Sequence, residues 1–198
     1  MHVKNKKIHG ITKKEGEYML YSYKQCLEKF GTDYQIKKEI EAGKLFMKEK
    51  GVYSDKKYVS EIAIISMKYP NAIFTSRSAF YYHGLTDAIP DYYYMATVRG
   101  ASQITDSRVK QIFENSDDVQ MGKTSLEYNG IKINVYNRER MLVELIRCKN
   151  KLPFDFYKEI VNNYRGILHE LDIESITEYA RCLPKKKMVM ETLQREVF

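Results

Sequence analysis

Between residues 22 and 53, apolar and polar positions follow a pattern that predicts two short helices and then a β-hairpin. Ser22 and Gln25 have the spacing of a capping box, in which each side chain bonds a backbone N–H of the first turn. The first helix is therefore expected to begin at Ser22 and to end before Gly31. Its apolar face is formed by Tyr23, Cys26, Leu27 and Phe30.

The second helix is predicted to begin at Thr32 or Asp33 and to stop at Gly43. Ile36 and Ile40 are four residues apart, so both point to the interior. Two short helices joined by a turn that contains Gly are typical of a helix-turn-helix, whose second helix can offer donors to base edges and phosphates. An ordinary solvated surface helix is the alternative. The outward face carries Tyr34, Gln35, Lys37, Lys38 and Glu41.

A hairpin is expected next, because residues 45–48 alternate and residues 52–53 resume after a turn that contains Gly51. Lysines on such a hairpin can contact phosphates as the wing of a winged helix-turn-helix. They can also blunt an edge strand against aggregation, and both roles are compatible. The candidate DNA-binding residues are Ser22, Thr32, Tyr34, Gln35, Lys37, Lys38, Lys44, Lys48 and Lys50.

A polar linker at residues 54–57 is the expected domain boundary, which gives a first domain at residues 1–57 and a second at residues 58–198. In the second, Asn129-Gly130 between apolar alternations predicts a hairpin, and Asn137 caps a helix. The fold class is therefore α+β: a winged N-terminal domain, then a larger mixed domain that ends in helices. Helices are expected at residues 58–69, 76–83, 108–113, 137–147, 154–168, 173–182 and 186–197, and strands at residues 92–98 and 125–136.

Charge is distributed unevenly along the 198 residues, whose net charge is +7. Residues 1–57 hold 14 lysines and 8 acidic residues, whereas residues 58–198 hold 19 basic and 18 acidic residues. A basic module joined to a nearly neutral body is typical of a protein that binds a polyanion. A lysine-rich solvated surface would have the same composition.

Three widely spaced cysteines, Cys26, Cys148 and Cys182, favour a reducing cytoplasm and argue against disulfides or a zinc site. No apolar run of about 18 residues is present, and the basic N-terminus lacks the apolar segment of a signal peptide, so we expect no contact with a membrane.

Catalytic motifs are not found in the sequence, so we expect neither an enzyme nor a cofactor or metal. His83 lies at a helix end, where capping or packing is expected of it. The adjacent acids Asp117 and Asp118 cannot share a helix or strand face.

Charged residues on the helix after Asn137 are interpreted as surface or domain-packing salt bridges. These are the pairs Glu139-Arg140 and Glu144-Arg147. Other basic residues give a possible second patch for DNA or an acidic partner: Arg77, Arg99, Arg108, Arg181, Lys185, Lys186 and Lys187.

Four blocks, spread in order over residues 17–195, carry a family resemblance. They are EAGKLFMKEKGVYSD, YPNAIFTSRSAFYYHGLTD, YYYMATVRG and GIKINVYNRERMLVELIR. Together they resemble the AbiEi-type antitoxins of bacterial abortive-infection systems, which are type IV toxin–antitoxin systems. Val98 stands where the family usually has Pro, and Met141 where it has Thr. The first helix of the winged fold would precede Ser22, but the lysine-rich residues 3–15 give no pattern for it.

The resemblance implies a bacterial, cytoplasmic phage-defence protein with an N-terminal winged helix-turn-helix. Such a protein binds inverted repeats of double-stranded operator DNA in its own promoter and represses the operon. It also counteracts a nucleotidyltransferase-like toxin encoded nearby, without a stable complex. Two alternatives remain from the residues themselves: a metal-dependent nuclease or other DNA-acting enzyme with a winged specificity domain, and a pure protein-interaction module.

Overall fold

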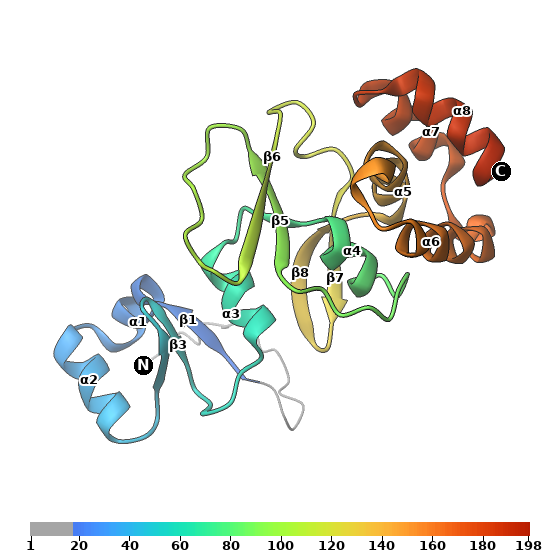
Figure 1. Cartoon of the computed structure of the whole chain (residues 1–198). Coiled ribbons are helices and arrows are strands. Elements are labelled where there is room, and N and C mark those ends of the chain that lie inside the picture. Colours follow the sequence, from blue (N-terminus) through green and yellow to red (C-terminus); the bar gives the residue numbers. More distant parts are fainter. Residues whose placement is uncertain (1–17) are drawn as a thin grey trace, which may run out of the picture. The chain divides into compact units, whose positions relative to one another are not determined.

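The computed structural model describes residues 18–198, so the lysine-rich residues 3–15 lie outside the described part. Within residues 18–198 the chain forms eight α-helices and two β-sheets, which confirms the α+β class (Figure 1). Its contacts divide it into two units, and the division falls after Lys68. The described part of the first unit is residues 18–68, and the second unit is Tyr69–Phe198.

The first unit places two helices and a hairpin around a three-stranded antiparallel sheet of order β1-β3-β2. Strand β1 reaches the sheet beside β3, so the hairpin β2–β3 is extended by a strand that precedes both helices. The elements are β1 (Leu20–Ser22), α1 (Tyr23–Phe30), α2 (Asp33–Glu41), β2 (Phe46–Glu49), β3 (Val52–Ser54) and α3 (Glu61–Lys68).

Local signals of the sequence account for α1, α2 and the hairpin, and these elements are confirmed, although Tyr23, expected on the apolar face of α1, is 41% exposed. Ser22 and Gln25 form the capping box of α1, and Thr32 caps α2. Gly31 ends α1 with φ of +87°, a conformation that costs little without a Cβ. The two helices close over the sheet through a small core of Cys26, Ile36, Leu45 and Tyr53.

Helix α3 belongs to the first unit by its contacts, whereas the sequence suggested a boundary at residue 57. The helix packs against β1 and β3, and Lys68 Nζ lies 2.7 Å from Glu49 Oε2 of β2. Residues 54–57 are polar, as a linker is, but the apolar face of α3 still needs a partner, and the nearest one is the sheet that precedes it.

The second unit is built on a mixed five-stranded sheet of order β6-β5-β4-β8-β7. The central strand β4 is two residues long; it is antiparallel to β5 and parallel to β8. The expected hairpin is confirmed, with Asn129 and Gly130 both at positive φ in its turn. The strands are β4 (Ile73–Phe74), β5 (Tyr93–Val98), β6 (Val109–Glu114), β7 (Lys123–Tyr128) and β8 (Ile131–Tyr136).

The helix predicted at residues 108–113 is wrong, because this segment is strand β6. It runs parallel to β5 in continuous register from Tyr93↔Val109 to Val98↔Glu114. The local pattern of VKQIFE is short and ambiguous, and the pairing partner decides its conformation. Gln111 then holds the connecting loop, since its side chain accepts a hydrogen bond from Ile104 N and donates one to Thr97 Oγ1.

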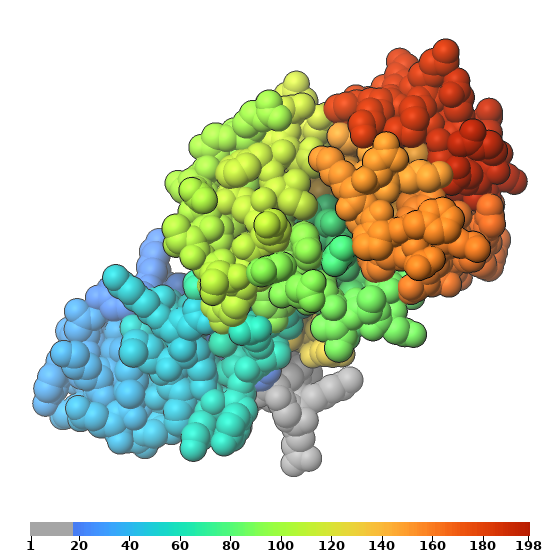
Figure 2. Space-filling model, in the orientation of Figure 1, coloured from blue at the N-terminus to red at the C-terminus, as the bar shows by residue number. Residues whose placement is uncertain are grey.

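The other helices expected in the second unit are present. Asn137 caps α5, since its side chain accepts a hydrogen bond from Arg140 N. The last three α-helices form the end of the unit coloured orange to red in Figure 2. Two short 3₁₀ turns, Lys149–Lys151 and Leu168–Glu170, bracket α6. The α-helices are α4 (Ser76–Tyr82), α5 (Arg138–Arg147), α6 (Phe154–Gly166), α7 (Ile173–Cys182) and α8 (Lys186–Glu196).

Candidate nucleic-acid interface

The outward face of α2 presents an aromatic ring and two ammonium groups. Ile36 is buried and fixes the rotation of the helix, so Tyr34 is 63% exposed on the other side. Lys38 Nζ lies 5.0 Å from the centroid of the Tyr34 ring, and Lys37 and Gln35 are also exposed. The structure therefore brings the four expected residues of α2 onto one surface.

Ser22 and Thr32 were expected at this surface, and the structure gives their side chains a local role. Ser22 Oγ accepts from Gln25 N at 3.2 Å, and Thr32 Oγ1 accepts from Gln35 N at 3.3 Å. Each oxygen thus satisfies a backbone N–H at a helix start.

One residue pair that fixes the two helices is not predicted by the sequence pattern. The Tyr23 hydroxyl of α1 donates to Asp33 Oδ1 of α2 at 2.6 Å. This hydrogen bond to the carboxylate raises the pKa of Tyr23. The pairing of two exposed polar side chains leaves no periodic signal, and only the turn geometry brings them together.

The two faces of the three-stranded sheet separate the lysines of the hairpin. Tyr53 points to the core under α1 and α2, so its neighbour Ser54 points to the opposite face, where α3 packs. Phe46 pairs with Ser54 and shares that face. Lys48, at the bulge of β2, lies with its Nζ 5.2 Å from the Phe46 ring, and it donates to Lys57 O. Lys48 therefore belongs to the face away from α2.

Lys44 and Lys50 differ from Lys48 in this respect. Lys44 is exposed directly after α2, and Lys50 is exposed at the tip of the hairpin beside Gly51. Gly51 has φ of +81°, which allows the tight turn. These two lysines keep the position expected of phosphate contacts.

The residues expected as a second basic patch do not gather on one surface. Arg108 lies before β6 and Arg99 after β5, and these strands are parallel, so the two arginines are at opposite ends of about 20 Å of sheet. Arg108 pairs with Asp106 at 2.7 Å, and Arg77 lies 3.7 Å from Asp91.

The C-terminal basic residues also have individual environments. Lys185 Nζ donates to Arg147 O at 2.6 Å, and Lys187 Nζ lies 4.0 Å from Glu191. Lys186 is exposed at the start of α8. Arg181 is exposed on α7 and lines a shallow hollow with Glu174 and other residues of the same helix.

Arg140, expected in a surface or domain-packing salt bridge beside Glu139, does form ion pairs, but they are buried and its partners are Glu144 and Glu114. Its side chain is 0% exposed, and Nε donates to Glu144 Oε1 at 2.9 Å. Its guanidinium carbon lies 4.9 Å from the Tyr136 ring centroid, and Nη2 lies 3.9 Å from Glu114 Oε2. Arg140 is on the core side of α5, and its carboxylate partners let the fold bury a charge there.

The neighbouring pair Glu144–Arg147 forms as predicted, three residues apart on α5. Because Glu144 contacts both arginines, it joins the buried guanidinium to a more exposed one. Burial raises the pKa of Glu114, and the nearby charge of Glu144 raises it further, while Arg140 opposes both.

His83 packs as expected. Its Nε2 donates to Tyr136 O at 2.7 Å, and burial lowers its pKa despite that hydrogen bond. Asp117 and Asp118 line a shallow hollow with Arg99. Among residues 18–198, no group of three or more His, Cys, Asp or Glu side chains has the arrangement of a metal site.

Comparison with known proteins gives no match, either to a family model or to a curated protein. Over the described residues, no helix has the length and apolar character needed to cross a membrane.

Proposed function

We propose that the chain is a DNA-binding protein whose first unit is a winged helix-turn-helix. One observation carries the proposal: α2 presents Tyr34, Gln35, Lys37 and Lys38 outward, and a hairpin with Lys50 at its tip follows at once. The strand order β1-β3-β2 and the Gly-containing turn between α1 and α2 fit the same class.

In this arrangement α2 enters the major groove and the hairpin follows the backbone. Gln35 can pair with an adenine edge, and Lys38 with a guanine edge, so these two residues supply sequence preference. Lys44 and Lys50 bind phosphates and set the orientation without reading sequence. Release of counterions from those phosphates makes the affinity fall steeply with salt.

The biological role that we propose is autorepression together with antitoxin activity in a type IV abortive-infection system. The operator would be an inverted repeat in the promoter of its own operon. The second unit would contribute to counteracting a nucleotidyltransferase-like toxin without forming a stable complex with it. Support for this role comes from the four sequence blocks, three of which lie wholly or mostly in the second unit.

The test is binding to a labelled duplex taken from the region upstream of the gene, measured by fluorescence anisotropy at several salt concentrations. Replacing Lys44 and Lys50 by Gln removes two phosphate contacts, so the slope of log K against log salt should become less steep by about 2. The charge-matched control replaces Lys151 and Lys158 of the second unit, both exposed, by Gln and should leave the slope unchanged. Equal slopes for the Lys44→Gln, Lys50→Gln double variant and the wild type would overturn the proposed interface.

A further inference from the structure

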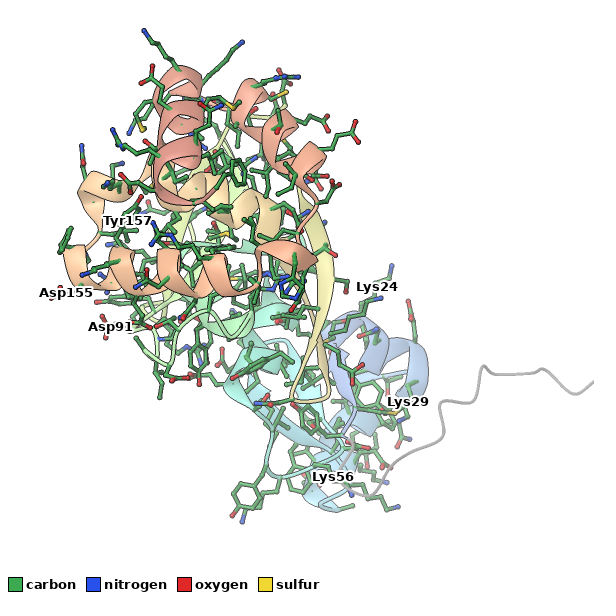
Figure 3. All side chains as sticks on the ribbon, turned by 90° about the vertical axis from the view of Figure 1, so that its right-hand side faces the viewer. Lys24, Lys29, Lys56, Asp91, Asp155 and Tyr157 are labelled. Carbon is green, nitrogen blue, oxygen red and sulfur yellow. The ribbon has the colours of Figure 1, made fainter. Side chains whose placement is uncertain are left out.

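A second basic and aromatic surface lies on the α3 side of the first unit. We call it the Tyr58 patch, and it consists of Lys48, Lys56, Lys57 and Tyr58. Tyr58 is 82% exposed, the largest exposed fraction among the big apolar side chains of the described residues. Lys56, labelled in Figure 3, extends from the same segment. The sequence pattern of this segment predicts only a linker.

The hydrogen bond from Lys48 Nζ to the backbone oxygen of Lys57 joins the hairpin to the segment and places the Lys48 ammonium group beside Lys57. Desolvation lowers the pKa of Lys48, and the charge of Lys57 lowers it further. Carboxylates nearby have other contacts: Glu49 pairs with Lys68, and Asp55 accepts from Met19 N. An anion that binds between two like positive charges relieves their repulsion and so stabilises the fold that holds them together.

Tyr58 adds a second kind of contact to this charge pair. Lys57 Nζ lies 5.8 Å from its ring centroid, and the ring is otherwise largely open to solvent. Bases in a duplex already stack on each other, whereas bases of a single strand can stack on an aromatic side chain. An exposed ring bordered by lysines therefore fits a single strand better than a duplex.

The position of the patch separates it from the proposed operator surface. Lys48 shares a sheet face with Phe46 and Ser54, whereas α2 covers the face of Tyr53. A straight duplex lying on α2 would thus leave the Tyr58 patch unoccupied. We propose that this patch binds single-stranded nucleic acid, with phosphates on Lys48 and Lys57 and one base stacked on Tyr58.

The first unit contains its own matched control for this proposal. Tyr34 and Lys38 on α2 form a similar exposed pair, with Nζ 5.0 Å from the ring centroid. The experiment measures anisotropy of the full chain with a labelled mixed-sequence single-stranded 20-mer and, separately, with a promoter duplex. The variants are Tyr58→Ala, Tyr58→Phe, Lys57→Gln and Tyr34→Ala.

Tyr58→Ala should weaken single-strand binding about fivefold or more, the loss typical of one stacked base. Tyr58→Phe should retain binding, since the ring is kept, and Tyr34→Ala should leave single-strand binding unchanged. Lys57→Gln should weaken binding and reduce its salt dependence. The proposal is overturned if the wild type does not bind the single strand, or if Tyr58→Ala and Lys57→Gln bind it like the wild type. It is also overturned if Tyr34→Ala and Tyr58→Ala lower single-strand binding equally.

The duplex arm keeps this inference distinct from the proposed function. A wild type that binds the single strand but not the promoter duplex would refute operator binding and leave the Tyr58 patch standing. Loss of duplex binding in Tyr58→Ala would show instead that duplex DNA occupies the patch, against the proposal.

Discussion

Replacing Arg140 by Met removes a buried charge while keeping most of the side-chain volume. The guanidinium lies 2.7 Å from Glu144 Oε1 and 3.9 Å from Glu114 Oε2, and its side chain has no exposed surface. Without it, Glu144 keeps only Arg147 as a partner, and Glu114 loses the guanidinium 3.9 Å away; the two carboxylate side chains are only 11% and 16% exposed. Losing one partner of a buried ion pair costs about 3–5 kcal/mol, so we expect Arg140→Met to lower the free energy of unfolding by that amount at pH 7. With a urea m-value of about 2 kcal/mol/M, the midpoint should fall by about 2 M.

The pH dependence of this loss separates the electrostatic cause from simple misfit. The pKa of Glu114 is already raised by burial, and Arg140 opposes that rise, so in the variant the folded-state pKa of Glu114 should lie further above its unfolded value. A carboxyl with a raised folded pKa is more stable protonated, so stability falls as pH rises through that pKa. Urea unfolding at pH 5 and pH 7 should therefore show a smaller deficit at pH 5. Arg181→Met, on an exposed position of α7, is the control and should change stability by less than about 0.5 kcal/mol. A deficit below about 1 kcal/mol for Arg140→Met, or one equal at both pH values, would refute the reasoning.

Two further predictions concern the second unit. Gly122 has φ of +72°, and a Cβ there would lie 2.6 Å from Arg140 Cβ. Gly122→Ala should therefore lower the free energy of unfolding by about 2 kcal/mol or more. A melting temperature equal to that of the wild type would contradict this. Burial alone would raise the pKa of Glu196, but hydrogen bonds from Lys149, Tyr157 and another cation lower it to about 2. A depressed folded pKa contributes stability above the unfolded value near 4.5 that is lost as pH falls towards 2, so Glu196→Gln should be less stable than the wild type at pH 7. The melting temperature of Glu196→Gln should therefore lie below that of the wild type at pH 7, and the difference should nearly disappear at about pH 2.5. The same difference at both pH values would count against this contact.

Sequence patterns were sufficient where a few adjacent residues decide the structure. The capping box at Ser22, the turn at Asn129-Gly130 and the cap at Asn137 each act within three or four residues, and all three are confirmed. Strand β6 depended on a partner strand that precedes it by a long loop, so the short pattern of residues 108–113 could not decide it.

In the candidate interface too, the sequence predicts what local periodicity decides and fails where contacts distant in the sequence decide. Periodicity gave the outward face of α2 correctly, because Ile36 and Ile40 fix the rotation of the helix. It could not place Lys48, since a bulge in β2 and the alternation of β3 decide which face that lysine occupies. Arg140 looked like a surface residue because nothing in its neighbourhood in the sequence records the distant carboxylate of Glu114.

The two-residue strand β4 has a consequence for how the second unit folds. On one side of it stand β5 and β6, and on the other the local hairpin β7–β8. The hairpin closes over a two-residue turn and can form within microseconds, whereas β4 meets β8 only when Phe74 reaches Val135 across a long stretch of chain. We therefore expect the hairpin β7–β8 to form early and the pairing of β4 with β8 to form late, as a step that slows the folding of the second unit.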